Sequence, residues 1–434
     1  MNLGILTAKY NHLKNSKYSF RWFAYILGAI AFMFTIFHRV NAAVLAPYII
    51  ETFQVSGSTL GFMSGIYFYV YSFSQPMVGV LVDTLKPRRM LTLSLLTISL
   101  GTFLFAYAPN ILFIYLGRFF IGAGCAGIFI PTNWIVNKYF AFEKRGFLLF
   151  ILQFIGNLGS VLAAAPLANL IRFLGWKGAL IFIGFISIAI SILIWLTVRD
   201  DHNPPSAESH HLTDTQEEEK KGWVSIVREV LHIPIIKYCL ISTIVYAAML
   251  SFQGLWVVPY LIDVYQVSKS SASSLATLIP TGFVIGLLLF SKLSDTGYGK
   301  YIYFYSTVLI TSIYLLLTIY TGNILPTFLP PLLFAIGIAH GATPYLLKIY
   351  ALVLPKKNYG TALGALNVTP FIMTAIYQSF SGLLFDLFGG SDILHRSVQS
   401  YRFYFLFLTI SLIIASLAIF NILRILRRDY RNII

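Results

Sequence analysis

Charged side chains are scarce in this sequence of 434 residues: 11% are Asp, Glu, Lys or Arg, and 57% are hydrophobic. An ordinary soluble domain carries about 25% charged residues, so the composition excludes that class of protein. Acidic residues are fewer than basic ones: the chain has 16 Asp and Glu and 31 Lys and Arg, which gives a net charge of +15. The basic residues stand in short groups between long apolar runs and form no basic domain, which excludes a nucleic-acid-binding protein.

Cysteine is also rare. The two cysteines, Cys125 and Cys239, lie inside apolar runs, so the sequence excludes a disulfide framework and a cysteine-rich metal site. His210 and His211 are neighbours in a charged stretch, and we interpret them as solvated rather than metal-binding. None of the apolar runs carries the H-E-x-x-H pattern of a metalloenzyme. We therefore expect no metal, no cofactor and no enzymatic activity.

Long apolar runs dominate what is present. A helix needs about 20 apolar residues to span a bilayer. Twelve runs of this kind lie near residues 21–48, 58–82, 90–107, 111–136, 146–170, 178–198, 234–261, 271–292, 301–321, 325–352, 360–385 and 402–424. The first run is too long for a signal-peptide core and has no small-residue cleavage site, so we expect it in the mature protein. The sequence predicts an all-α membrane protein with 12 transmembrane helices.

The basic residues indicate how these helices are oriented. If both termini lie on one side, that side receives 24 Lys and Arg in its loops and the other side receives five. The remaining two, Arg39 and Arg118, fall inside spans. Because cytoplasmic loops are enriched in Lys and Arg, both termini are predicted to be cytoplasmic. We expect a bacterial inner membrane, with a lysosomal membrane as the alternative.

One polar stretch divides the chain into two six-span halves. Residues 199–230 predict a linker that ends in a short amphipathic segment from about Trp223, which leaves an N-terminal half, 1–198, and a C-terminal half, 231–434. After the second span stands GVLVDTLKPRR, and after the eighth stands SKLSDTGYGK. Matching loops in two halves indicate a duplicated transporter, whose solute site lies between the halves near the bilayer midplane.

These loops resemble the major facilitator superfamily. Its signature G-x-L-x-D-x-x-G-x-[RK]-[RK] is matched except at its second glycine, where Lys86 stands. The fourth span, LGRFFIGAGCAGIFIPTNW, resembles a second signature of this superfamily. The resemblance implies two pseudo-symmetric halves and cytoplasmic gating networks formed by Asp83, Arg88, Arg89, Arg118, Glu143, Arg145 and Asp295. The glycine cluster that marks the fifth span of antiporters is absent, which argues against efflux.

Arg39 is the leading candidate for binding a solute. An ion inside a span is costly and therefore functional by default, and a guanidinium binds a carboxylate or phosphate with two hydrogen bonds. Its context, HRVNAAVLAPYI, resembles organophosphate antiporters and anion:cation symporters, whose matching arginine holds the anionic group. The antiporters carry a second arginine where this chain has Ser251, so we expect a carboxylate or zwitterion. Pairing of Arg39 with a helix carbonyl stays open as a structural alternative.

Further candidates are polar or aromatic side chains inside spans, each weighed against simple packing. They are His38, Tyr67, Tyr71, Gln75, Asn157, Gln253, Trp256, His340 and Asn367. None of the 16 acids lies deep in a span, so a co-transported proton would use His38 or His340. An uncoupled carrier stays open.

The leading hypothesis is a monomeric alternating-access importer of a small carboxylate, sugar acid, amino acid or short peptide. Two stretches, GIYFYVYSFSQPMVGVLVD and GLWVVPYL, also resemble phagosomal amino-acid transporters and the lysosomal dipeptide carrier. The alternatives are an exporter of drugs, metabolites or a carboxylate siderophore, and a membrane receptor or enzyme. The partners expected are the solute, a proton and the lipid bilayer.

Overall fold

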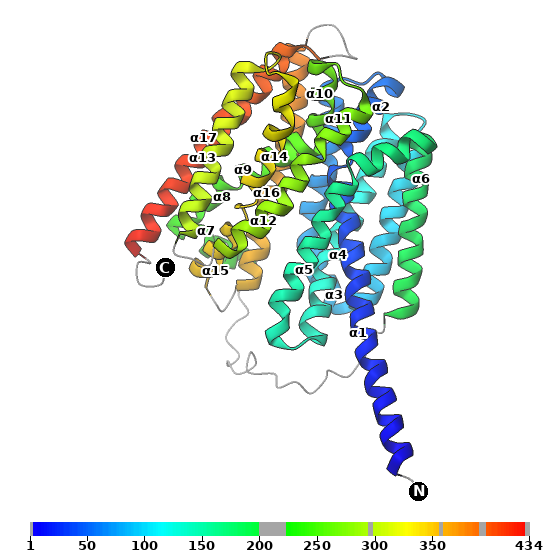
Figure 1. The fold of residues 1–434 in the computed structure, drawn as a ribbon. Helices are drawn as coiled ribbons and strands as arrows, with labels where there is room; N and C mark the ends of the chain where they lie inside the picture. The colour runs from blue at the N-terminus through cyan, green and yellow to red at the C-terminus, as the bar shows by residue number, and fades with distance from the viewer. Residues whose placement is uncertain (1–2, 199–222, 294–297, 356–358, 390–395, 430–434) are drawn as a thin grey trace.

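The computed structural model describes residues 3–198, 223–293, 298–355, 359–389 and 396–429, and all regular secondary structure in these ranges is helical (Figure 1). The N-terminal half contains α1 (Leu3–Val40), α2 (Ala42–Phe53), α3 (Gly57–Ala106), α4 (Ile111–Tyr139), α5 (Phe142–Leu162) and α6 (Ala165–Thr197). The C-terminal half contains α7 (Trp223–Leu231), α8 (Pro234–Ser242), α9 (Ile244–Ser251), the π-helix η1 (Phe252–Trp256), α10 (Val257–Tyr265), α11 (Lys269–Ala276), α12 (Leu278–Leu293), α13 (Gly299–Tyr320), the 3₁₀-helix η2 (Pro326–Phe328), α14 (Leu329–His340), α15 (Tyr345–Val353), α16 (Tyr359–Phe388) and α17 (Val398–Asp429).

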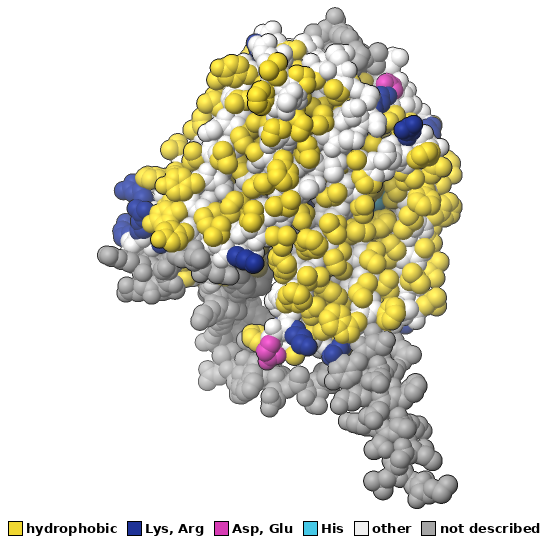
Figure 2. Space-filling view, in the orientation of Figure 1, with side chains coloured by type: hydrophobic (Ala, Val, Ile, Leu, Met, Phe, Trp, Pro, Cys, Tyr) yellow, Lys and Arg dark blue, Asp and Glu magenta, His cyan; other side chains and the backbone are white. Residues whose placement is uncertain are grey.

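The predicted spans are confirmed by these helices. Within the described residues, 11 helical segments are long and apolar enough to cross a membrane, and they match 11 of the predicted spans in order. The span predicted near residues 58–82 is the first arm of α3, which a break at Lys86 separates from the second arm. Hydrophobic side chains cover the lateral surface, and Lys and Arg lie near its ends (Figure 2).

The break at Lys86 has a backbone conformation that glycine favours. Lys86 has φ 63° and ψ 156°, so its side chain sits where an L-residue is strained by about 1–3 kcal/mol. This is the position at which the loop signature has its second glycine. The chain therefore keeps the turn of the signature without the residue that forms it most easily.

The fifth span differs from its prediction. The apolar run predicted at 146–170 is interrupted between α5 and α6, at Ala163 and Ala164. The first arm of α6 continues it, and Gly175, with φ 69°, then turns the chain into the sixth span. Alanine is a good helix former and the run is uniformly apolar, so hydropathy gives no sign of this interruption.

The structure describes the end of the predicted linker, from Trp223, and the division of the chain at 199–230 stays a prediction. Helix α7 begins at Trp223, buries Ile226 and Val230, and exposes Arg228, which is the amphipathic pattern expected. Four residues singled out in the sequence lie outside the described part of the structure: His210, His211, Asp295 and the side chain of Asp83.

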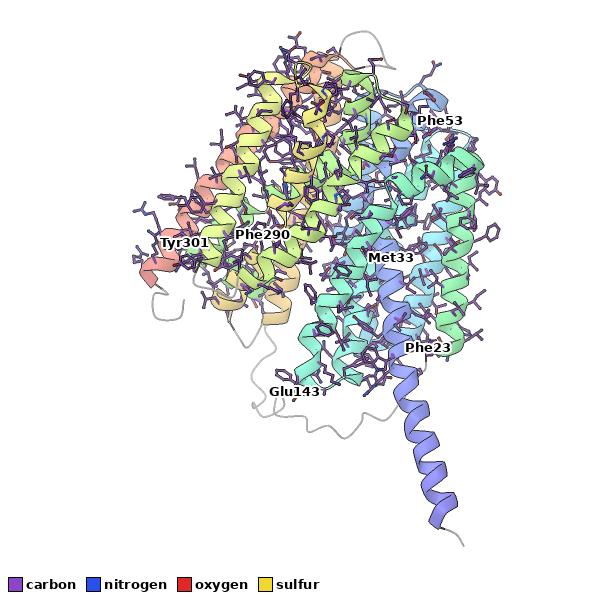
Figure 3. The ribbon with its side chains drawn as sticks, viewed as in Figure 1. Phe23, Met33, Phe53, Glu143, Phe290 and Tyr301 are labelled. Atoms are coloured by element: carbon purple, nitrogen blue, oxygen red, sulfur yellow. The ribbon has the colours of Figure 1, made fainter. Side chains whose placement is uncertain are left out.

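The two halves contact each other at one end of the molecule and diverge at the other. Helix α1 begins and α17 ends at the same end, which we call the terminal end; the opposite end is the outer end (Figure 1). Phe53 lies at the outer end and Glu143 at the terminal end (Figure 3). At the outer end the Lys269 ammonium lies 2.5 Å from the Glu51 carboxylate of the other half.

At the terminal end α16 faces open space. Asn367 is exposed although it lies within a span, and no atom lies within 4 Å of the position that a Cβ on Gly364 would take. The space-filling view is hollowed there, between the halves (Figure 2). The molecule is therefore closed at the outer end and open at the terminal end.

Candidate functional site

Arg39 lies where the two halves meet. It stands in the last turn of α1, just before the break at Asn41 that separates α1 from α2, and only 5% of it is exposed. Its Nη1 donates to the hydroxyl of Tyr246 on α9 at 3.3 Å. The guanidinium carbon lies 4.7 Å from the ring centre of Phe371 on α16 and 5.3 Å from that of Tyr71 on α3. Both halves thus contribute side chains to this cation.

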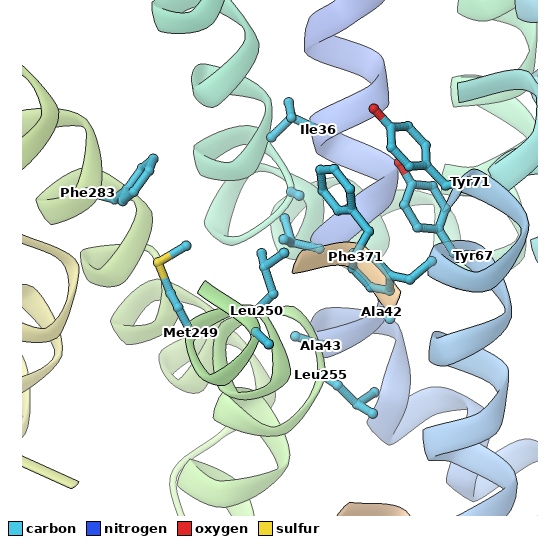
Figure 4. Close-up of a cluster of buried hydrophobic side chains, with 14 of the residues drawn as sticks. Ile36, Ala42, Ala43, Tyr67, Tyr71, Met249, Leu250, Leu255, Phe283 and Phe371 are labelled. Atoms are coloured by element: carbon cyan, nitrogen blue, oxygen red, sulfur yellow. The ribbon is translucent and has the colours of Figure 1, made fainter. Parts of the chain in front are cut away.

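Aromatic rings surround the guanidinium. Tyr67 and Tyr71 stack at 6.0 Å, and the edge of Phe371 meets Tyr71 at 4.9 Å across the two halves. In Figure 4 these rings lie close together in one buried cluster that also contains Leu250. A cation above a ring gains about 0.5–2 kcal/mol, which offsets only part of the cost of burying a charge.

No carboxylate in the described part of the chain pairs with the Arg39 guanidinium. Among the described residues Arg39 forms no ion pair, and its Nε has no hydrogen-bond partner. A buried charge is normally paired, so this arrangement suits an anion that binds from outside the protein. A guanidinium with a free N–H edge can hold a carboxylate or sulfonate through two hydrogen bonds.

Arg118 lies far from the terminal end. Its Nη1 donates to the carbonyl oxygen of His38 at 2.9 Å and to Oδ1 of Asn41 at 3.2 Å, where α1 meets α2. It is 1% exposed and lies 21 residues before the end of α4 at Tyr139, about 31 Å away along the helix. Arg118 therefore contacts the backbone next to Arg39, and the gating role that the resemblance implies for it stays a prediction.

Four of the predicted gate residues, all in the described part of the chain, lie at the terminal end: Glu143, Arg145, Arg88 and Arg89. Glu143 is exposed at the beginning of α5, and Arg145 donates from Nε to the carbonyl of Phe140 at 3.1 Å. The guanidinium of Arg88 lies 4.0 Å from the ring centre of Trp195, and Arg89 is exposed. The gating network itself stays a prediction.

Three candidate solute ligands are engaged within their own half. Nε1 of Trp256 donates to Oγ of Ser381 at 2.6 Å. Nδ2 of Asn157 donates to the carbonyl of Gln153, one turn earlier in the same helix, at 2.8 Å. Nδ1 of His340 lies 2.7 Å from the carbonyl oxygen of Ile336 in α14. These contacts stay within one half, and a solute role for Trp256, Asn157 and His340 stays a prediction.

Two further candidates lie on the terminal side of the Arg39 group. Gln75 stands one turn beyond Tyr71 and is half-buried, while Asn367 stands one turn before Phe371 and is exposed. Residues four apart share a helix face, so Gln75 and Asn367 lie on the terminal side of the Tyr71–Phe371 ring pair. Their role as solute ligands stays a prediction.

Two buried polar groups near the break have an unpartnered atom. Nε2 of His38 has no partner, and its Nδ1 lies 3.4 Å from Nδ2 of Asn41. Oε1 of Gln253, in the π-helix η1, also has no partner. Such atoms are costly to bury and common at functional sites.

Tyr246 and Phe371 were missed by sequence reasoning. Aromatic residues make up 16% of the chain, so neither position stands out in the pattern. Both contact Arg39 only because α9 and α16 pack against α1 and α3, from which they are far apart in sequence. Tyr67 and Tyr71 were expected, and both lie in the group.

The comparison with known families decides the fold family. Residues 22–258 and 239–432 match the sequence model of the Major Facilitator Superfamily. The chain belongs to the major facilitator superfamily. As a member it is a multi-pass membrane transporter of small organic solutes and not an enzyme. Its two halves of six spans are those of this superfamily, as the loop signatures predicted.

Named relatives are distant. The probable sulfoacetate transporter SauU of Cupriavidus necator is 26% identical over 200 residues, which is 46% of this chain and 45% of SauU, so the match spans less than half of that protein. The uncharacterized transporter YybO of Bacillus subtilis is 24% identical over 395 residues, 85% of this chain and 88% of YybO.

One solved structure has a similar shape over nearly the whole chain. It is a bacterial homologue of the human lysosomal transporter Spinster in an inward-facing, unoccupied conformation. The TM-score is 0.76 with 19% identity, and the match covers 94% of this chain and 98% of the homologue. At this identity the likeness shows the fold alone.

Proposed function

We propose that this protein is an alternating-access transporter that imports a small organic anion, and that Arg39 binds the anionic group. The observation that carries the proposal is the buried Arg39 guanidinium at the meeting point of the halves, which has no ion-pair partner among the described residues. An alternating-access site is expected at this place, because both halves must reach the solute as they rock.

The surroundings of Arg39 favour a single negative charge. Nη1 of Arg118 donates to His38 and Asn41, while its Nε and Nη2 have no partner, and Ser251 shares a hydrogen bond with the hydroxyl of Tyr404 at 3.1 Å. We assign the solute to the Arg39 guanidinium, because side chains of both halves contact it, whereas the hydrogen bonds of Arg118 lie within its own half. A monocarboxylate or monosulfonate fits this better than a phosphate dianion.

The same surroundings suit an apolar or aromatic body. Tyr71, Phe371 and Tyr246 present rings around the guanidinium, and Leu250 lies beside them. The ammonium group of an amino acid or peptide would find no carboxylate deep in a span, since the acids stand at helix ends or in loops. An amino acid or peptide is thus the weaker of our original candidates.

The named relative sets a useful comparison. The name of SauU gives sulfoacetate, which carries one sulfonate and one carboxylate. Its sulfonate fits the Arg39 guanidinium, but its second charge would require another cation. Comparing the binding of sulfoacetate with the binding of a monosulfonate of similar size therefore distinguishes a site with one cation from a site with two.

Two features of the sequence and the site bear on the direction of transport and on proton coupling. The missing antiporter cluster in the fifth span favours import over efflux. His38 is the candidate for carrying a proton, since it precedes Arg39 and its Nε2 is buried without a partner. Facilitated transport without a proton is the alternative. Bacterial relatives support a cell membrane as the location, with the terminal end in the cytoplasm.

A thermal-shift screen of the purified protein tests the proposal. The ligands are nicotinate, a propanesulfonate, sulfoacetate, glycerol phosphate and an amino acid, because a ligand of the folded state raises the melting temperature in proportion to its binding. We expect stabilisation by the monoanions, its loss in Arg39→Gln, and its retention in Arg172→Gln, which changes an exposed arginine on the outer side. Stabilisation that survives Arg39→Gln would refute the proposal.

A further inference from the structure

Helices α3 and α16 belong to different halves, yet their backbones touch at the outer end. On α3, Gly57, Gly61 and Gly65 stand four residues apart and so share one face. A Cβ added to Gly61 would lie 2.3 Å from the carbonyl oxygen of Gln378 on α16, and one added to Gly382 would lie closer still to the carbonyl oxygen of Gly57. No side chain fits at these distances, so only glycine permits this contact, which we call the glycine seam.

Asp386 closes the outer end of the seam. Its Oδ1 accepts from the backbone N–H of Gly57 at 2.6 Å, and its Oδ2 accepts from that of Ser58 at 2.9 Å. These are the first two amides of α3, which have no partner inside their own helix. The hydroxyl of Ser56 accepts from the third amide, that of Thr59, at 3.2 Å. The α3 N-terminus is thus capped by its own half and by the opposite half together.

The charge of Asp386 suits this position. Backbone N–H groups at a helix N-terminus form a partial positive charge, and a carboxylate that accepts from them makes short, directional bonds. Both amides are fixed by the helix, so only the carboxylate has to be ordered. When the halves separate at the outer end, these bonds must break and water must replace them.

The second ionic contact across the outer end is of a weaker kind. Asp386 is exposed too, but it binds two amides that the helix holds in place, whereas Lys269 and Glu51 are two long side chains, 31% and 57% exposed. Exposed ion pairs contribute little to stability because water screens them and ordering costs entropy. The contact of Asp386 with the α3 amides is therefore the one to test, and the Lys269–Glu51 pair is its control.

We propose that Asp386 is the latch of the outer gate. Its carboxylate caps α3 across the glycine seam and so stabilises the state that is closed at the outer end and open at the terminal end. The latch lies at the end opposite to the loop signature, and it requires no bound solute. It would hold whether or not Arg39 is the solute ligand.

Distances between spin labels at the outer end test the latch in the full-length protein. Pro109 in the N-terminal half and Asn323 in the C-terminal half are exposed at that end, and Cys125 and Cys239 are buried away from label. Spin labels are attached to cysteines introduced at positions 109 and 323. Double electron–electron resonance, measured without solute, then gives the ratio of outer-open to outer-closed molecules. We expect Asp386→Asn to raise this ratio by about tenfold, the order expected for two charged hydrogen bonds.

Two controls separate the latch from general destabilisation. Glu51→Gln should change the ratio by less than about twofold. Asp386→Glu keeps a carboxylate and should restore part of the closed population. A ratio in Asp386→Asn equal to that of the unmutated protein would overturn the proposal, as would an equal or larger effect of Glu51→Gln.

A matched pair of glycine variants keeps the test decisive if Asp386→Asn does not fold. Gly61→Ala places a methyl group against the Gln378 carbonyl and should favour the outer-open state, because the two halves can then no longer meet. Gly364→Ala adds the same methyl group to α16, where nothing lies within 4 Å, and should leave the ratio unchanged. Suppose that Asp386→Asn does not fold. Then a ratio of outer-open to outer-closed molecules that is the same in Gly61→Ala, in Asp386→Glu and in the unmutated protein would refute a gate at this seam.

Discussion

Arg39 and Tyr246 join the two halves of the protein, with Nη1 of the arginine 3.3 Å from the hydroxyl oxygen of the tyrosine. The tyrosine is half-buried and comes from α9, and its hydroxyl takes one of the guanidinium donors. A solute anion at Arg39 competes with this hydroxyl. The contact therefore links solute binding to the relative position of the halves.

Tyr246→Phe should strengthen anion binding. The variant keeps the ring and removes only the competing hydroxyl, whose hydrogen bond is worth about 0.5–1.5 kcal/mol, so the affinity should rise about two- to tenfold. Isothermal titration with the anion found by the thermal-shift screen measures this. Weaker binding in Tyr246→Phe would mean that the hydroxyl itself contacts the solute.

Arg118→Gln should destabilise the protein. It removes the donor to the His38 carbonyl and leaves buried acceptors unsatisfied, at a cost of about 1–3 kcal/mol. Thermal unfolding in detergent should show a clear fall in melting temperature, while Arg172→Gln at the exposed outer loop should show none. An unchanged melting temperature in Arg118→Gln would contradict a stabilising role for these hydrogen bonds.

Trp256→Phe should affect stability but not solute choice. The indole N–H donates to Ser381, and the ring lies 4.4 Å from that of Phe385, so its contacts are internal to the C-terminal half. We expect a loss of about 1 kcal/mol in stability with the same order of preference among anions. A changed order of preference in uptake assays would place Trp256 at the solute site.

Protonation of a phosphate ester should improve its binding. The second phosphate pKa is about 6, so lowering the pH from about 7.5 to about 5 converts the dianion to a monoanion. Glycerol phosphate should then stabilise the protein more, whereas a propanesulfonate, charged once throughout, should be unaffected. Equal gains for both ligands would point to a titrating protein group instead of a one-cation site.

Apolar runs were enough to predict the spans, because the bilayer demands a long apolar segment wherever the chain crosses it. They could not show the break at Ala163 and Ala164, since those residues are as apolar as their neighbours. The turn at Gly175 does fall in the connection expected between the runs 146–170 and 178–198. Arg39 was visible because a cation inside an apolar run is costly. Its place was predictable from one segment of sequence.

The partners of Arg39 were not predictable in this way. Phe371 and Asp386 stand on α16, more than 300 residues from Arg39 and Gly57, the groups that they contact. A single sequence does not show which residues so far apart along the chain come into contact. The contacts of Arg118 could not be predicted for the same reason: its fourth-span motif identifies the helix, but only packing shows that its guanidinium reaches the end of α1.

Solute uptake into proteoliposomes tests the central claim most directly, with Arg39→Gln compared against Arg172→Gln and the unmutated protein. Each is incorporated at equal amounts after size-exclusion chromatography has shown that it is folded. The account predicts that Arg39→Gln lowers uptake of the stabilising monoanion by about 10- to 100-fold, as expected for the loss of charged hydrogen bonds, while Arg172→Gln transports normally. Uptake by folded Arg39→Gln at the rate of the unmutated protein would contradict it.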